Sequence, residues 1–300
     1  MKLRIVHRTI YRYADLVTQN TNEVRLKPLS AAPQNCDWFE LNLTPRARCS
    51  SYVDFYFNYV QRFEIPEPHR ELVIESVSTV TTGEPNLPSE ADSAPMTRLS
   101  ECHRLEKCHD FIQPTAFIPL TPEVWRLAID ASEAQTGIWQ TARSMAAFVH
   151  CNFKYSPNST TINTPLADIL LRKEGVCQDF AHLMLAMCRS LKIPARYVSG
   201  YIYNGAAEKL LGAQASHAWC EVFVPEIGWC GLDPTNNQPA DQRYVKLAVG
   251  RDYSDVAPIK GYYRGTPDRE LKVELEICEL SPTHNFGPSE SKDVAVKSIL

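Results

Sequence analysis

The chain has 300 residues, of which 44% are hydrophobic. This is enough for one large domain or two ordinary ones with a substantial core, and it excludes disorder of the whole chain. The 31 basic and 35 acidic residues give a net charge of −4 with no long run of either sign, so the sequence predicts no nucleic-acid partner.

The N-terminus is charged, because Lys2, Arg4 and Arg8 interrupt its apolar residues before they reach the length of a signal peptide. No later stretch approaches the about 18 uninterrupted apolar residues of a membrane helix. We therefore expect a cytoplasmic protein without a membrane partner. In a reducing cytosol the ten cysteines should remain thiols, most of them small buried hydrophobes.

The first 80 residues alternate between apolar and polar side chains and are rich in β-branched and aromatic types, which predicts an antiparallel β domain over residues 1–85. Its strands are expected over 2–7, 39–43, 51–57 and 72–77. Residues 81–95 are rich in proline, serine and acidic side chains, as in a linker. A second domain is expected over residues 86–281, and residues 282–300 are expected to be disordered.

Apolar residues at helical spacing predict helices over 123–134 and 138–150. A third helix is predicted with Thr164 as its N-cap, and a fourth begins at or just after Val176 and ends before Pro194. The period then changes to two, which predicts further strands. These are expected over 196–203, 218–224, 229–233 and 271–280, with the second and third joined as a hairpin.

Cys177 lies at the predicted start of the fourth helix, two residues after Gly175. An ordinary thiol, with a pKa of about 8.5, is mostly protonated at neutral pH, but unpaired N–H groups and the dipole at a helix N-terminus favour the thiolate. His217 immediately precedes one strand of the predicted hairpin, and Asp233 ends the other. Adjacent antiparallel strands bring residues to about 5 Å, so the three side chains meet if the turn register allows it. This order predicts a nucleophile, its base and an orienting carboxylate.

The residues around these positions resemble bacterial transglutaminase-like proteins, a family that includes candidate cysteine proteases. The similar motifs are GVCQDFAH at 175–182, IPARYVSGY at 193–201, SHAW at 216–219, DPTN at 233–236 and GRDYSDVAP at 250–258. The resemblance extends to the N-terminal region through His7, Thr9, Tyr11, Tyr13, Pro68 and His69, and so covers nearly the whole chain.

The resemblance implies an α+β fold: a papain/transglutaminase-like core, with the cysteine helix packed on an antiparallel sheet, preceded by the family's N-terminal antiparallel β domain. It places Cys177, His217 and Asp233 on the family's catalytic triad. The chain departs from the pattern at Phe57, where the family has a glycine in a strand turn of the N-terminal domain.

We interpret these residues as the site of a cysteine-dependent acyl-transfer enzyme that acts on peptide or carboxamide bonds through a thioester, with a peptide or protein substrate. Water as the acceptor gives a peptidase or amidase, and an amine gives a transglutaminase. Nothing in the sequence marks a site for an amine, which favours hydrolysis. A protein-glutamine transglutaminase and a non-catalytic protein-binding module on the same fold stay open, as do the acyl substrate and the oligomeric state.

The oxyanion of each tetrahedral intermediate needs hydrogen-bond donors, and the backbone N–H of Cys177 is the natural first one. The second is expected from Tyr155 or Gln178; Tyr155 ranks ahead because the family often has an aromatic donor upstream of the cysteine. Trp219 is expected to pack beside His217 and to shield it from water.

Two Cys-His pairs, Cys102-His103 and Cys108-His109, place four potential zinc ligands within eight residues. Their spacing fits no common zinc site, and adjacent residues point in different directions on a helix or a strand. No calcium-loop pattern is present either. We expect neither a metal nor another cofactor.

Overall fold

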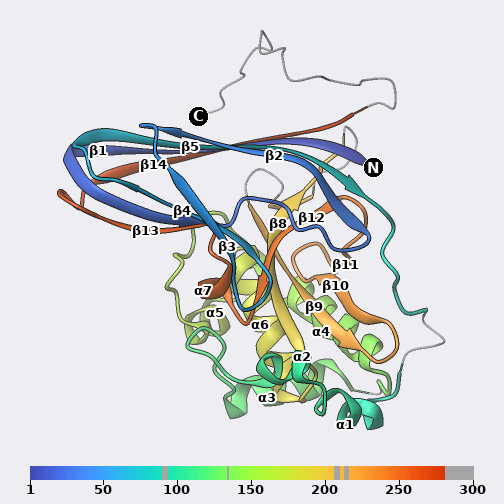
Figure 1. Ribbon diagram of the computed structural model, residues 1–300. Coiled ribbons are helices and arrows are strands. Elements are labelled where there is room, and N and C mark those ends of the chain that lie inside the picture. The colour runs from blue at the N-terminus through green and yellow to red at the C-terminus, as the bar shows by residue number, and fades with distance from the viewer. Residues whose placement is uncertain (90–93, 134, 206–209, 213–215, 281–300) are drawn as a thin grey trace.

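The computed structural model describes residues 1–89, 94–133, 135–205, 210–212 and 216–280. They form a long twisted sheet that lies across the top of the view in Figure 1 and an α+β core below it. The predicted disordered tail, 282–300, lies outside the described residues.

The upper sheet has seven antiparallel strands arranged around β1 (Lys2–Val24). The first half of β1 pairs with β5 (His69–Thr82), and its second half pairs with β4 (Tyr59–Ile65). The remaining strands from the N-terminal part of the chain are β2 (Gln34–Thr44) and β3 (Cys49–Val53). The predicted antiparallel β domain is therefore present. β1, β2 and β5 extend beyond their predicted bounds, whereas the strand expected over 51–57 ends at Val53 and β4 was not predicted.

The last two strands of the chain, β13 (Ile259–Arg264) and β14 (Arg269–Glu279), also pair with β1. The sequence analysis places residues 86–281 in the second domain. The structure differs, because β13 and β14 complete the sheet of the N-terminal domain. Alternation along a strand identifies which residues share a face, but it does not identify the partner strand. The chain thus leaves the upper sheet, builds the core and returns.

The core consists of a five-stranded antiparallel sheet and helices that pack on it, with α6 (Cys177–Ser190) at the centre. Its strands, in spatial order, are β11 (Gln238–Pro239), β10 (Gly228–Asp233), β9 (His217–Val224), β8 (Ala195–Ile202) and β12 (Tyr244–Gly250). The short strands β6 (Lys154–Tyr155) and β7 (Glu174–Gly175) form a separate parallel pair.

The core helices are α1 (Leu99–Cys102), α2 (Glu106–His109), α3 (Pro122–Ala131), α4 (Ile138–Asn152), α5 (Leu166–Arg172) and α7 (Tyr253–Val256), with the 3₁₀ turns η1 (Met96–Arg98) and η2 (Asp110–Ile112). Residues 179–189 of α6 are all buried, because this helix is apolar over most of its surface and is covered by neighbours on all sides. α6 therefore holds its N-terminal residues on a rigid support.

The start of α5 differs from the prediction. Its N-cap is Pro165 and its first residue is Leu166, whereas Thr164 was the expected cap. The hydroxyl of Thr164 instead accepts a hydrogen bond from the Thr161 N–H at 2.9 Å, which tightens the preceding turn. Competition between a local side-chain turn and a helix cap therefore shifts the start of the helix by one residue.

Apolar and polar contacts join the upper sheet to the core. Leu3, Ile5 and Val80 pack with Tyr201 and Val245 of the core sheet. The Tyr201 hydroxyl also lies 2.7 Å from Nδ1 of the buried His7. The two parts of the chain therefore share buried side chains and form one body.

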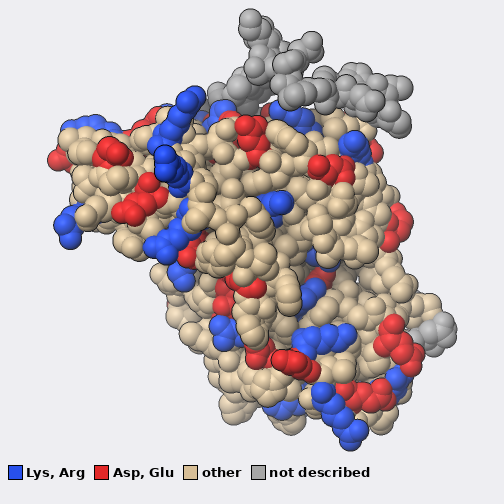
Figure 2. All heavy atoms as spheres, viewed as in Figure 1, with Lys and Arg blue, Asp and Glu red and all other residues tan. Residues whose placement is uncertain are grey.

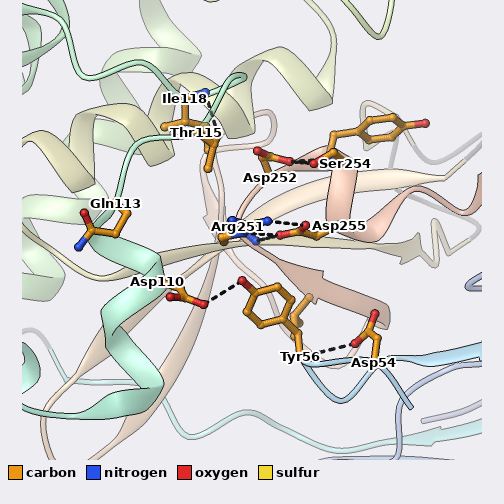
Figure 3. Close-up of polar contacts among 12 residues, drawn as sticks. Asp54, Tyr56, Asp110, Gln113, Thr115, Ile118, Arg251, Asp252, Ser254 and Asp255 are labelled. Atoms are coloured by element: carbon orange, nitrogen blue, oxygen red, sulfur yellow. Dashed lines mark hydrogen bonds and ion pairs between the residues drawn. The ribbon is translucent and has the colours of Figure 1, made fainter. Parts of the chain in front are cut away.

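The β3–β4 turn is anchored to the core as well. Figure 3 shows Tyr56 pointing toward Asp110, to whose Oδ2 its hydroxyl donates at 3.0 Å, beside the ion pair of Arg251 with Asp255. Phe57 in this turn has φ of +65°, the conformation that glycine adopts easily. The turn thus keeps the geometry for which the resemblance expects glycine, although Phe57 occupies it.

Basic and acidic side chains are interspersed on the face of the molecule shown in Figure 2. Among the described residues, no helix has the length and hydrophobicity needed to cross a membrane.

Candidate functional site

Cys177 is the first residue of α6 and is half-buried. The carboxylate of Asp179, in the first turn, accepts hydrogen bonds from the Val176 N–H at 2.8 Å and from the Thr160 hydroxyl at 2.7 Å. Asp179 therefore caps the helix start and holds the loop before it. A Cβ on Gly175 would lie 2.9 Å from the Cβ of Asp179, so glycine is needed for this close approach.

His217 and Asp233 form the centre of the site. Nε2 of His217 lies 2.9 Å from Oδ2 of Asp233, and both side chains are fully buried. The register explains the contact: Leu232 of β10 pairs with Cys220 of β9, so Asp233 follows one residue beyond the ladder, near the start of β9. In the neutral imidazole, a proton held on Nε2 by Asp233 leaves Nδ1 as a hydrogen-bond acceptor.

The charges around His217 favour its protonated form. Burial by itself lowers the pKa of His217, but Asp233 and then Cys177 outweigh burial and raise it to about 10. Burial raises the pKa of Asp233, yet His217 and the hydrogen bonds to the carboxylate hold it below its usual value. Because Asp233 occupies Nε2, Nδ1 is the nitrogen available to the thiol of Cys177. The arrangement can therefore stabilise a thiolate–imidazolium pair.

Additional donors hold the Asp233 carboxylate. Oδ1 accepts from the Thr235 N–H at 2.8 Å, and Oδ2 accepts from the Tyr244 hydroxyl at 2.8 Å and from Nδ2 of Asn236 at 2.7 Å. A buried carboxylate with this many donors remains ionised and fixed in orientation.

Sequence reasoning did not assign roles to Tyr244 and Asn236. Asn236 stands in the DPTN motif, where it could have been considered as a turn residue that bonds back to the aspartate. Tyr244 begins a strand that the alternation analysis missed, so nothing in the sequence connected it with Asp233.

Trp219 occupies its expected place beside the histidine. Its buried ring is nearly parallel to the imidazole of His217, with centroids 6.2 Å apart and an interplanar angle of 21°. The Tyr244 ring meets Trp219 edge-on at 5.2 Å. These rings enclose the imidazole and keep water from one side of it.

The two predicted oxyanion donors have different surroundings. Tyr155 in β6 pairs with Gly175 of β7, and its half-buried ring packs against Phe180. Burial and then the nearby Cys177 raise the pKa of Tyr155 to about 12, so its hydroxyl remains a donor at neutral pH. Nε2 of Gln178, in contrast, donates to the Ile162 carbonyl at 3.2 Å and ties the preceding loop to α6.

The two Cys-His pairs do not form a cluster. Cys102 and Cys108 are buried beside Phe223, whereas Nε2 of the exposed His103 lies 2.8 Å from the Lys192 carbonyl oxygen. Within the described ranges, no three or more His, Cys, Asp or Glu side chains are arranged to hold a metal ion.

Comparisons with known proteins agree with this architecture. The model of the transglutaminase-like superfamily matches residues 126–234, and that of the bacterial transglutaminase-like N-terminal region matches residues 3–81. A candidate cysteine protease from Cytophaga hutchinsonii has a similar crystal structure, with a TM-score of 0.76 and 21% identity over 96% of this chain and 93% of that one. At this identity the likeness establishes the fold.

Relatives in sequence match this chain over most of its length or over less than half of it. An uncharacterized protein from Mycobacterium leprae is 34% identical over 93% of this chain and 99% of its own length. A protein-glutamine gamma-glutamyltransferase from Pseudomonas aeruginosa is 33% identical over 42% of this chain and 21% of its own length. With a transglutaminase-like core, the matching N-terminal region and a full-length relative, this chain belongs to the bacterial transglutaminase-like proteins of the transglutaminase-like superfamily.

Proposed function

We propose that the protein is a cysteine-dependent acyl-transfer enzyme in which Cys177 is the nucleophile, His217 its base and Asp233 the residue that orients the histidine. The buried hydrogen bond of 2.9 Å between His217 and Asp233 is the observation that carries the proposal, because it orients the imidazole beside the cysteine at the start of α6. A buried histidine–carboxylate pair next to an accessible thiol is the arrangement that activates cysteine nucleophiles.

In the first step, Nδ1 of His217 takes the thiol proton and the thiolate of Cys177 attacks the carbonyl carbon of a peptide or carboxamide. The C–N bond then breaks, and the imidazolium gives its proton to the departing amine. In the second step a water molecule loses a proton to His217 and attacks the thioester, which releases the acid and restores the thiol. Asp233 stays ionised throughout and fixes the imidazole.

Each tetrahedral intermediate places negative charge on the former carbonyl oxygen. The backbone N–H of Cys177, at the first position of α6, supplies one donor. We assign the second donor to Tyr155, because strand pairing places it beside Gly175, two residues before Cys177, and burial keeps its hydroxyl protonated. We rank Gln178 lower, since its amide already binds the Ile162 carbonyl.

We propose water as the usual acceptor, and a peptide or protein as the acyl donor. The family relation also includes a transglutaminase, so transfer to an amine is the second candidate. We propose a cytoplasmic location, in which the ten cysteines would remain thiols.

A paired assay tests the proposal. The protein is incubated with a glutamine peptide and with a mixed peptide library, in each case with and without a fluorescent primary amine. Ammonia release, peptide cleavage and amine incorporation are then measured. We expect acid products that do not require the amine and that disappear in Cys177→Ala but persist in Cys151→Ala, which removes an exposed cysteine as a matched control. Products unaffected by Cys177→Ala would overturn the proposal, and rapid amine incorporation would assign a transglutaminase instead.

A further inference from the structure

The side chain of Asn236 is bonded to two different parts of the site. Its Nδ2 donates to Oδ2 of Asp233 at 2.7 Å and to the Leu211 carbonyl at 3.2 Å. Its Oδ1 accepts from the Leu211 N–H at 2.9 Å. The Asn236 amide therefore bonds both the N–H and the C=O of Leu211. Its other N–H bonds the Asp233 carboxylate.

The residue after Leu211 lies against the imidazole. Gly212 has φ of +81°, and a Cβ placed on it would lie 2.5 Å from Nδ1 of His217. Nδ1 is buried and, within the described ranges, has no hydrogen-bond partner of ordinary geometry. Gly212 therefore covers the nitrogen that must exchange a proton with Cys177, and only glycine fits this position.

We propose that Asn236 is a positioning residue with two linked effects: it fixes the Asp233 carboxylate, and it holds Leu211–Gly212 against Nδ1 of His217. Covering Nδ1 keeps water away from the thiolate–imidazolium pair, and electrostatic attraction is stronger where water is excluded. The inference rests on the proposed function, because it concerns the proton transfer between Cys177 and His217.

Two other variants separate these effects. Tyr244→Phe removes a donor to Asp233 without touching Leu211. Asn204→Ala removes an acceptor for the N–H of Leu210, at 3.2 Å, without touching Asp233. The first is a control for the carboxylate. The second is a matched control for loss of an asparagine side chain, because it removes a bond to Leu210 and leaves both bonds of Asn236 to Leu211 in place.

The experiment measures two quantities in the full chain: the rate of Cys177 alkylation by iodoacetamide between pH 5 and 9, located by mass spectrometry, and the hydrogen exchange of the Leu211 amide by NMR. For Asn236→Ala we expect alkylation at pH 6 to fall at least fivefold and Leu211 exchange to accelerate at least tenfold. Tyr244→Phe should slow alkylation but leave Leu211 exchange within twofold of wild type. Asn204→Ala should leave the pH profile of alkylation unchanged.

If Asn236→Ala leaves either quantity within twofold of wild type, the inference is wrong. Should that variant fail to fold, Gly212→Ala provides the test, because its methyl group would press on Nδ1 and should slow alkylation at pH 6 at least fivefold. An unchanged rate in Gly212→Ala would overturn the inference. If the wild-type Cys177 reacts no faster than an ordinary thiol, the proposed function fails. The hydrogen exchange of the Leu211 amide still tests, independently of that function, whether Asn236 holds Leu211.

Discussion

The imidazole of His217 and the carboxylate of Asp233 are joined by a hydrogen bond of 2.9 Å between side chains that are completely buried. Because the carboxylate also accepts bonds from Tyr244 and Asn236, its orientation is determined by the fold before any substrate binds. Preorganised groups need not reorganise during the reaction, and this accounts for much of their effect on rate.

Asp233→Asn should reduce turnover by roughly 100-fold or more. Replacing the carboxylate that orients a catalytic histidine by a neutral amide lowers turnover by this much or more. The new amide would also direct N–H groups at Tyr244 or Asn236, which already donate to this position. Measurement of kcat and KM for the wild type and for Asp233→Asn checks the prediction. A loss confined to KM would contradict it, because Asp233 is assigned no contact with substrate.

Gly175→Ala should destabilise the start of α6. The added methyl group would lie 2.9 Å from the Cβ of Asp179, and such overpacking costs about 1–3 kcal/mol. Urea denaturation measures the loss. Gly205→Ala is the matched control, because the nearest neighbour to its Cβ would be 3.8 Å away. Equal free energies of unfolding for Gly175→Ala and Gly205→Ala would contradict the prediction, because they would show that Asp179 can move away from the added methyl group.

Glu221→Gln should destabilise the core sheet by about 3 kcal/mol at pH 7, the lower end of the cost of breaking a buried ion pair. The buried Glu221 carboxylate contacts Arg196 and Lys246 at 2.6 and 2.9 Å, so the variant leaves two cations without a counter-charge. Urea denaturation of both proteins at pH 7 and at pH 3 measures the difference.

The pH dependence of this effect has a definite sign. Burial raises the pKa of Glu221, but Arg196 and Lys246 outweigh burial and lower it from 4.5 to about 2. The stabilisation is therefore fully present above pH 4.5 and is lost as the pH falls through about 2. The difference between wild type and variant should shrink at low pH, and a difference that grows would contradict the assignment.

The wild-type protein should lose stability as the pH falls from 6.5 to about 4, partly through His7. Burial lowers the pKa of His7 from 6.5 to about 4, so the unfolded chain binds a proton in this range and the folded chain does not. His7→Gln should retain a bond to the Tyr201 hydroxyl and show a shallower slope of unfolding free energy against pH. Equal slopes would exclude a contribution from His7.

The sequence was most informative about local features near the proposed site. The helix that starts at Cys177 and the strands that carry His217 and Asp233 were predicted within a residue or two, because apolar periods and Pro194 mark them clearly. The fold class, the family and the packing of Trp219 on His217 are likewise confirmed.

The pairing of strands that lie far apart in the sequence could not be predicted from local patterns. The attachment of β14 to β1 joins residues more than 250 positions apart, such as Leu3 and Glu279, and alternation alone carries no information about such partners. The contact of Tyr244 with Asp233 depends on the strand order β10-β9-β8-β12, which also lies beyond a local pattern. Side chains that support a site from another strand are thus the residues that sequence reasoning misses.

The measurement that tests the central claim most directly is the rate of Cys177 alkylation by iodoacetamide against pH, with the modified site located by mass spectrometry, in wild type and in His217→Ala. An activated thiolate paired with His217 predicts fast labelling of Cys177 well below pH 8 in wild type and much slower labelling in the variant. Labelling of Cys177 that follows an ordinary thiol in both proteins would contradict the account and would favour a protein-binding module on the same fold.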